Sequence, residues 1–346
     1  MNAVKYLSNY VKNIEPFFID FFNKERKIAS KVDPLAVEVI DTLEDFIKGG
    51  KKVRGALTVL GYQSVGGIDL DRIYPISMAI ELMHSSLLIH DDFIDKDLFR
   101  RGKPTVHSIY SKKYSPHHGA SISLIIGDVG IFLSNKLFAE SGFNNKVITK
   151  ALSIYEKLLV NTGYGEIMDI AFDFKEDITW EDIMKVRIYK TAHYTFALPL
   201  SVGAILGGAN ESILDAVMEY SEPVGIAFQI RDDILGIFGD SNLTGKSNNS
   251  DILEGKMTLL YSKALENGSG VQKKFLRKWY GNKNISQEEI KKIKKIIMNT
   301  KSLESSQTFA LNLVKKGKLN TKKITGVKSY KEVLDTLADY IVSRDK

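Results

Sequence analysis

Hydrophobic residues recur at three- and four-residue spacing along most of this 346-residue chain. This spacing places apolar side chains on one face of an α-helix, so it predicts helices rather than strands. Alternating strands joined by Asn-Gly or Asp-Gly turns are not evident. The sequence therefore predicts an all-α fold, and the segments with the helical pattern are 35–48, 72–98, 119–139, 146–172, 179–206, 210–235 and 258–266.

Loop signals separate these segments without marking a second domain. They cluster at 48–52, 99–104, 112–119 and 239–257. The chain has only 7 prolines, and it contains no Pro/Ser-rich linker and no abrupt change in composition. We therefore expect one domain over residues 1–346, built as one large bundle of helices.

The charge of the chain is basic, with a net charge of +6 and a pI near 9.0. Such a surface attracts anionic ligands such as phosphates, but it also fits ordinary solvated lysines. The Lys-rich segments 285–301 and 315–323 have no interleaved aromatic residues on which bases would stack. We therefore expect no nucleic-acid partner.

Cysteine usage and hydropathy limit the chemistry and the location. The chain has 0 cysteines, which excludes disulfides, thiolate metal sites and a cysteine nucleophile. Its first residues mix charged and apolar positions, unlike a signal peptide. The sequence has no run of 18 or more consecutive apolar residues, so we expect a cytoplasmic protein without a membrane span.

A first group of acidic residues ends an apolar helical segment. The sequence HSSLLIHDDFIDKDLFRRGKPTVH places Asp91, Asp92 and Asp95 within about one helical turn, followed by Arg100 and Arg101. Crowded carboxylates repel each other unless a cation lies between them, and hard oxygen ligands suit Mg²⁺. Guanidinium groups match phosphate oxygens. By itself the short pattern also fits an acidic helix end with surface arginines.

A second group repeats the arrangement in GIAFQIRDDILGIFGD, where Asp232 and Asp233 again end an apolar helical segment. A Gly-rich loop follows, TGKSNNSDILEGKMTLL, which contains Lys246, Asp251 and Lys256. This loop alone needs no ligand. Two aspartate pairs on separate apolar helices are harder to explain without one, because burying carboxylates costs several kcal/mol unless metal or basic partners compensate.

These motifs resemble the trans-isoprenyl diphosphate synthase (polyprenyl synthetase) family, and in particular its short-chain geranylgeranyl diphosphate synthases. The resemblance extends from about residue 45 to 262 and rests on GGKKVRG, DDFID with RRG, Lys190-Thr191, FQIRDD and GKSNNSDILEGKMT, which follow the family order. It implies the isoprenoid synthase fold, a single large antiparallel bundle of roughly ten helices around a central cavity. It also implies a homodimer, and condensation of isopentenyl diphosphate with an allylic diphosphate.

The resemblance also implies residue roles. Isopentenyl diphosphate would be held by Lys51, Arg54, His84 and Arg101. Three Mg²⁺ ions, with Mn²⁺ as an alternative, would be held by Asp91, Asp95 and Asp232. The allylic diphosphate would be bound by Arg100, Lys190 and Lys256. Further catalytic or substrate-binding roles fall on the remaining matched residues, which are Asp92, Glu166, Thr191, Gln229, Asp233 and Lys246.

The chain departs from the family pattern at four positions. Lys52 and Gly55 replace the common Arg and Pro, and Gly236 stands where a third aspartate often lies. Glu166 replaces the usual Gln in GEIMD. The last change is either a tolerated isosteric exchange or one that alters metal binding or cation stabilisation.

Product length depends on the helix that carries Asp91, because one helical turn rises about 5.4 Å, close to one isoprene unit. In similar enzymes a bulky aromatic five residues before the motif stops growth early. Here that position is Ser86, with Leu87 beside it and Met83 one turn deeper. We expect a C20 product that ends near Met83. A C25–C30 product is the close competitor because Met is flexible, and farnesyl diphosphate is a further alternative.

Three other classes of protein compete with this interpretation. A one-substrate terpene cyclase would not need Lys51, Arg54 and Arg101. A non-catalytic subunit usually loses an aspartate motif, and this chain keeps both. A basic nucleic-acid-binding protein would leave both aspartate pairs unexplained.

Overall fold

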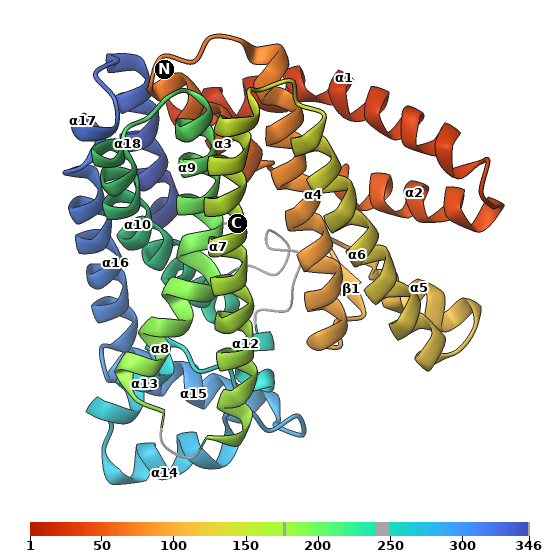
Figure 1. Cartoon of the computed structure of the whole chain (residues 1–346). Helices are drawn as coiled ribbons and strands as arrows, with labels where there is room; N and C mark the ends of the chain where they lie inside the picture. The colour runs from red at the N-terminus through yellow and green to blue at the C-terminus, as the bar shows by residue number, and fades with distance from the viewer. Residues whose placement is uncertain (176–177, 240–248, 345–346) are drawn as a thin grey trace. The chain divides into compact units, whose positions relative to one another are not determined.

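The computed structural model describes residues 1–175, 178–239 and 249–344 (Figure 1). These residues are almost entirely helical, which confirms the predicted all-α class. The described strands are β1 (Phe99–Arg100) and β2 (Lys103–Pro104), which pair antiparallel as a short hairpin.

The helices vary in length from single turns to long core helices. In chain order they are α1 (Ala3–Ala29), α2 (Pro34–Ile47), α3 (Val53–Ser64), α4 (Leu70–Ile94), α5 (Val106–Lys113), α6 (Pro116–Ala139), α7 (Asn145–Ala171), η1 (Phe172–Phe174), α8 (Trp180–Val186), η2 (Arg187–Ala197), α9 (Leu198–Leu206), α10 (Glu211–Phe238), α12 (Ser250–Glu254), α13 (Leu259–Asn267), α14 (Gly270–Trp279), α15 (Gln287–Asn299), α16 (Ser302–Lys318), α17 (Thr321–Ile324) and α18 (Lys328–Ser343). Among them η1 is a 3₁₀-helix and η2 a π-helix.

The predicted segments correspond to α2, α4, α6, α7, α10 and α13, and the segment 179–206 contains α8, η2 and α9. Two boundaries differ from expectation. The segment predicted over 72–98 ends at Ile94, because the chain turns into the hairpin. α6 begins at Pro116, inside the loop predicted over 112–119, because Ser115 caps its first turn. The predicted segments did not include α1, α3, α5, the C-terminal helices α14 to α18, or α12, which lies inside the loop predicted over 239–257.

The chain forms two compact units. The first unit comprises Met1–Ile154 and Pro199–Glu211, and the second comprises Tyr155–Leu198 and Ser212–Lys346. Each has its own set of buried apolar side chains. The expectation of one domain over the whole chain stays a prediction.

In the first unit, α4 packs lengthwise along α6 (Figure 1). Two glycines of α6 make this approach possible. A methyl group added at Gly127 would lie 2.2 Å from Nε2 of His90, and one at Gly130 would lie 2.1 Å from Oγ of Ser86. Small residues therefore bring α6 close to the helix that carries the first acidic group.

Among the described helices, α6 is long enough and apolar enough to cross a membrane, judged by length and composition alone. Its most apolar window has a mean hydropathy of 1.5 and is 39 % buried. Core helices of soluble proteins also have this composition, and α6 packs along α4 in the first unit.

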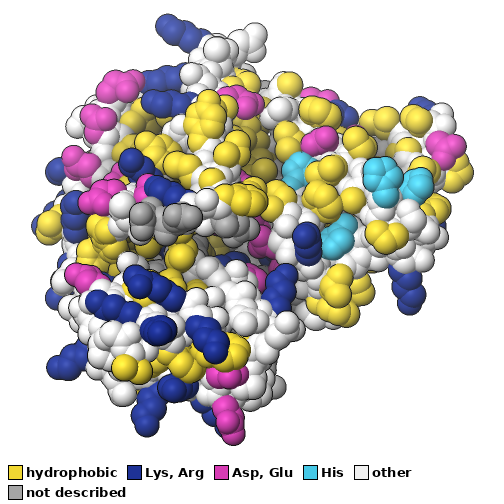
Figure 2. Space-filling model, turned by 90° about the horizontal axis from the view of Figure 1, so that it is seen from below, with side chains coloured by type: hydrophobic (Ala, Val, Ile, Leu, Met, Phe, Trp, Pro, Cys, Tyr) yellow, Lys and Arg dark blue, Asp and Glu magenta, His cyan; other side chains and the backbone are white. Residues whose placement is uncertain are grey.

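Figure 2 shows Lys and Arg side chains spread over one face of the molecule, with acidic and hydrophobic side chains between them.

In the second unit, α10 packs into the core, with Val217, Val224 and Ile237 fully buried. The hydroxyl of Tyr220 donates a hydrogen bond to the carbonyl of Leu334 in α18 at 2.8 Å. These contacts fix the helix whose C-terminal turns carry the second acidic group.

A substitution tests the close packing of α3 on the Pro199–Leu206 part of α9. A methyl group added at Gly203 would lie 1.9 Å from the carbonyl oxygen of Thr58. We predict that Gly203→Ala lowers the free energy of unfolding by roughly 1–3 kcal/mol, because backbone atoms cannot move aside cheaply. Thermal and urea unfolding measure this. The control is Gly163→Ala, where nothing lies within 4 Å, and a gain of about 0.5–1 kcal/mol is expected there. Equal stability of the two variants would contradict the packing.

Candidate active site

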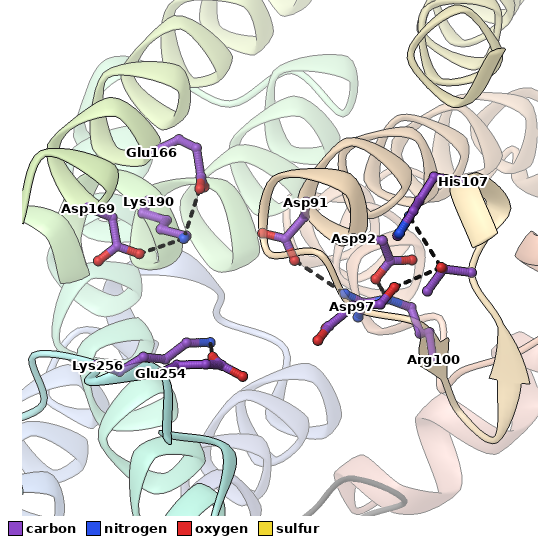
Figure 3. A network of polar contacts seen from close by, with 11 residues as sticks. Asp91, Asp92, Asp97, Arg100, His107, Glu166, Asp169, Lys190, Glu254 and Lys256 are labelled. Atoms are coloured by element: carbon purple, nitrogen blue, oxygen red, sulfur yellow. Dashed lines mark hydrogen bonds and ion pairs between the residues drawn. The ribbon is translucent and has the colours of Figure 1, made fainter. Parts of the chain in front are cut away.

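Arg100 binds the first aspartate pair (Figure 3). Its Nε donates to Oδ1 of Asp92, and its Nη2 donates to Oδ2 of Asp91 at 3.2 Å. Burial raises the pKa of Asp92 to about 6, and Arg100 offsets only part of that rise. The second oxygen of Asp92, Oδ2, is buried without a hydrogen-bond partner in the structure. Asp95 lies at the C-cap of α4, where its amide donates to the carbonyl of Asp91 at 2.8 Å.

Arg101 lies in the turn of the hairpin and reaches the glycines of the GGKKVRG motif. Its backbone is left-handed, with φ of 51°. A methyl group added at Gly49 would lie 2.6 Å from Nη1 of Arg101, and one at Gly50 would lie 2.8 Å from Nη2. The guanidinium therefore packs directly on the two glycines, which explains why this motif has no side chains there.

Arg54 and His84 form a hydrogen-bonded pair, with 3.0 Å between Nη1 of Arg54 and Nε2 of His84. Burial lowers the pKa of His84 well below its ordinary value, and the charges of Arg54, Arg101 and Arg100 lower it further. The imidazole is therefore neutral and accepts from Arg54 at Nε2. With exposed Lys51 at the start of the same segment, this part of the first unit is a basic surface suited to a diphosphate.

Two departures from the family pattern have structural explanations. The Nζ of Lys52 donates to the carbonyl of Ile47 at 2.6 Å and lies 5.2 Å from the ring centroid of Phe18. Lys52 therefore fixes the chain before α3. A methyl group added at Gly55 would lie 2.0 Å from the hydroxyl of Tyr10, so the proline common in the family does not fit here.

Glu81 was not predicted as a site residue. Its carboxylate is buried and accepts a hydrogen bond from the amide of Gly55 at 2.7 Å. The N-cap residue of α3, Lys52, makes no side-chain capping bond, so Glu81 caps α3 from α4. Burial raises the pKa of Glu81, and Gly55 and Arg54 oppose the rise. The sequence signal was a lone acidic residue in an apolar helix, three residues before His84.

In the second unit, Arg344 binds Asp232 through an ion pair between Nη2 and Oδ1. The guanidinium lies 4.1 Å from the ring centroid of Phe228. The carbonyl of Arg344 in turn accepts from Nε of Arg231 at 2.8 Å. No sequence signal predicts Arg344, because it follows α18 and lies more than a hundred residues from its partner in the chain.

Asp233 belongs to a chain of hydrogen bonds. Arg187 donates to its Oδ2 at 2.6 Å, and Nε2 of Gln229 donates to its Oδ1 at 3.0 Å. The hydroxyl of Thr191 donates to Oε1 of Gln229 at 3.0 Å. Burial raises the pKa of Asp233, and Arg187 opposes the rise. Three predicted residues, Thr191, Gln229 and Asp233, are thus connected, and Arg187 is an addition that the sequence did not reveal.

Lys190 lies between two carboxylates of α7 (Figure 3). Its Nζ donates to Oε1 of Glu166 at 3.0 Å and to Oδ2 of Asp169 at 2.6 Å. Lys190 and Thr191 are part of the π-helix η2, and such wide turns are frequent at functional sites. Gly165 allows the approach, since a methyl group there would lie 2.3 Å from the amide nitrogen of Lys190.

Lys256 follows α12, and its Nζ lies 3.0 Å from Oε2 of Glu254 (Figure 3). Its carbonyl accepts from the hydroxyl of Tyr280 at 2.9 Å. Lys246, the other lysine predicted in this loop, lies outside the described residues.

The described residues include no three Asp, Glu or His side chains already assembled as a metal site. Mg²⁺ does not need such a cage, because it commonly uses one or two carboxylates together with waters and substrate phosphates. The half-buried carboxylate of Asp91 and the exposed carboxylate of Asp95 supply hard oxygen donors. The residues of the first acidic group therefore fit a magnesium ion bound with a diphosphate.

The predicted chain-length residues lie on the buried side of α4. Met83 and Ser86 are fully buried, and Leu87 is half-buried. The hydroxyl of Ser86 donates to the carbonyl of Leu82 at 2.9 Å and faces Gly130 of α6.

Comparisons with known proteins agree with these motifs. Residues 37–297 match the family described as "Polyprenyl synthetase". A short chain isoprenyl diphosphate synthase of Methanocaldococcus jannaschii is 36 % identical over 86 % of each chain. A geranylgeranyl diphosphate synthase of Saccharolobus solfataricus is 34 % identical over 78 % of each chain. A crystal structure of geranylgeranyl pyrophosphate synthase from Corynebacterium glutamicum, complexed with isoprenyl diphosphate and magnesium, has a TM-score of 0.91 and 26 % identity. It covers 99 % of this chain and 100 % of its own.

A pH titration of stability tests the burial of Glu81. The pKa of Glu81 in the folded protein lies above the ordinary value of 4.5. Between the unfolded and the folded pKa, the folded protein therefore binds more protons than the unfolded chain. The parent protein loses stability as the pH rises through this range. Glutamine does not titrate. We predict that Glu81→Gln gains stability relative to the parent between about pH 5 and about pH 8. Urea unfolding at both pH values measures this difference.

The control is Glu219→Gln, which removes one exposed carboxylate from α10. If the stability difference between Glu81→Gln and the parent is the same at both pH values, folding does not raise the pKa of Glu81 and the prediction is wrong.

Proposed function

Because this chain belongs to the polyprenyl synthetase family, we propose that it is a trans-prenyltransferase. It condenses isopentenyl diphosphate head to tail with an allylic diphosphate and makes geranylgeranyl diphosphate (C20). The observation that carries the proposal is the presence of two aspartate pairs, each held by arginine at the end of an apolar helix. The 34 % identity to a geranylgeranyl diphosphate synthase supports the product.

Isopentenyl diphosphate binds to the basic residues of the first unit, Lys51, Arg54, His84 and Arg101. The hydrogen bond between Arg54 and neutral His84 holds the guanidinium in one orientation. The Gly49–Gly50 surface does the same for Arg101. Preformed positions of this kind remove part of the entropy cost of bringing two substrates together.

The allylic diphosphate binds to Arg100, Lys190, Lys246 and Lys256, with Mg²⁺ on Asp91, Asp95 and Asp232. We propose three Mg²⁺ ions, with Mn²⁺ as an alternative; when bound, they neutralise the charge that develops on the leaving diphosphate. The cationic side chains add to this stabilisation. Arg100 is held in place by Asp91 and Asp92, so it needs little reorganisation to contact a phosphate.

The reaction has three steps. The bond between the allylic carbon and the diphosphate oxygen breaks, and both electrons leave with the diphosphate. The double bond of isopentenyl diphosphate attacks the resulting allylic cation and forms the new carbon–carbon bond. The tertiary cation then loses a proton to the released diphosphate. The hydroxyl of Thr191 and the amide of Gln229, held together at 3.0 Å, provide oxygen dipoles that stabilise the cation.

A terpene cyclase of the same fold is the second candidate. It acts on one allylic substrate and needs no site for isopentenyl diphosphate. The Arg54–His84 pair and Arg101 on its glycines favour a two-substrate enzyme over a cyclase.

We also propose that the protein is a cytoplasmic homodimer without a membrane span. The exposed face of α6 carries Ile125 and Phe132, which are 61 % and 67 % exposed. A row of large apolar residues on a helix fits a protein partner better than water. A second copy of the chain covers this face.

A product assay tests the proposed function. Labelled isopentenyl diphosphate is incubated with C5, C10 or C15 allylic diphosphates, with and without Mg²⁺, and the dephosphorylated products are sized by chromatography. We predict elongation to C20 that requires both Mg²⁺ and isopentenyl diphosphate. Products of C25–C30 or a stop at C15 would support the alternative synthases. Cyclic products formed without isopentenyl diphosphate would overturn the proposal in favour of the cyclase.

A substitution at Met83 tests the product length. The side chain is fully buried one turn below Ser86 on α4. If the growing chain ends against Met83, then Met83→Ala frees space along about one helical turn of α4. That space corresponds to one isoprene unit or more. We predict products longer than C20 with the same assay. Met78→Ala, on the same helix and also buried, is the matched control for loss of packing. Unchanged lengths in Met83→Ala exclude Met83 as the end of the cavity.

A further inference from the structure

Gly236 lies at the position where the family motif often has a third aspartate, and the carboxylate of another residue fills the space beside it. A methyl group added at Gly236 would lie 2.3 Å from Oδ2 and 2.9 Å from Oδ1 of Asp251. The missing side chain of α10 is therefore replaced, in space, by a carboxylate from α12.

Asp251 is held firmly in this position. Its side chain is only 9 % exposed. Its backbone carbonyl accepts from the amide of Lys256 at 3.0 Å, and Gly255 between them has a φ of 72°, which reverses the chain. The carbonyl of Ile252, the next residue, accepts from the amide of Gly281 at 2.8 Å. Asp251 thus sits in an ordered turn rather than at a loop tip.

The charges around Asp251 belong to the second acidic group. Lys256 and Arg187 act on its carboxylate as cations, and Asp233 acts on it as an anion. Arg187 also donates to Asp233 and to the carbonyl of Met257, at 2.6 and 3.3 Å. One arginine therefore connects α10 to the segment that follows α12, and Asp251 lies beside that connection.

We propose that Asp251 supplies, from α12, the third carboxylate of the second acidic motif, and that Gly236 is glycine in order to make room for it. Asp251 is a positioning residue: it acts through Lys256 and Arg187, which it keeps beside Asp233. The proposal rests on the proposed function for the identity of the ligand, a diphosphate with divalent cations. Outer partners of this kind typically change metal affinity by about 10- to 100-fold when removed.

The test moves the carboxylate from one helix to the other. Asp251→Ala removes it, and the double variant Asp251→Ala with Gly236→Asp restores it from α10 into the vacated space. The readouts are the Mg²⁺ concentration at half-saturation and the thermal shift produced by Mg²⁺ with inorganic diphosphate. We expect Asp251→Ala to raise the half-saturating Mg²⁺ about tenfold, and the double variant to return most of the way to the parent value.

Three further variants keep the test decisive. Asp251→Asn preserves shape and removes charge, so it raises half-saturation without lowering the melting temperature of the free protein. Gly236→Asp alone lowers that melting temperature, because its side chain collides with Asp251. Glu219→Gln, at an exposed carboxylate of α10 paired with Lys323, is the control for net charge and leaves Mg²⁺ saturation unchanged.

A double variant no better than Asp251→Ala would overturn the proposal, as would an Asp251→Asn protein with parental Mg²⁺ saturation. The thermal shift with inorganic diphosphate needs no turnover. If the parent protein binds Mg²⁺ and diphosphate but makes no prenyl product, the proposed function fails while the role of Asp251 is still tested.

Discussion

The carboxylates at the ends of apolar helices need cations beside them, and much of each unit is arranged to provide these. Arg100 holds Asp91 and Asp92 from the hairpin that follows α4. In the second unit Arg187 and Arg344 hold Asp233 and Asp232. A buried carboxylate without a partner costs several kcal/mol, so these arginines make the acidic helix ends compatible with a folded protein. The same arginines also bring positive charge to the places where we propose that a diphosphate and its metal ions bind.

The sequence predicted what depends on nearby residues. The three- and four-residue spacing located α4 and α10, and the DDFID motif identified the first acidic group together with Arg100 a few residues later. Local chain geometry was enough in these cases, because one helical turn and one hairpin connect the partners. The sequence also flagged Gly55 and Gly236 as departures, but not their cause. That cause is the hydroxyl of Tyr10 in one case and the carboxylate of Asp251 in the other.

The sequence did not predict pairings between residues far apart in the chain. Glu81 is 26 residues from Gly55, Arg187 is 46 from Asp233, and Arg344 is 112 from Asp232. A periodic pattern says which face of a helix is buried but not which side chain it meets there. The π-helix was missed because the segment 179–206 has helical spacing throughout, and the change of spacing over Arg187–Ala197 is too small to detect in the sequence.

This chain has Glu166 where the family usually has Gln, and the difference changes the charge of the cluster around Lys190. With glutamine, Lys190 and Asp169 would form a neutral pair. With Glu166 also bound at 3.0 Å, the three side chains carry a net charge of −1. Two carboxylates hold the ammonium group of Lys190 more strongly than one, so less of its positive charge is available to a diphosphate. The net negative charge also favours a nearby cation, either a metal ion or an allylic carbocation. Because these side chains are 23 to 40 % exposed, solvent screens the effect. We therefore propose that Glu166 shifts the balance between holding the leaving group and stabilising the cation without abolishing either, whereas a tolerated isosteric exchange would leave both unchanged.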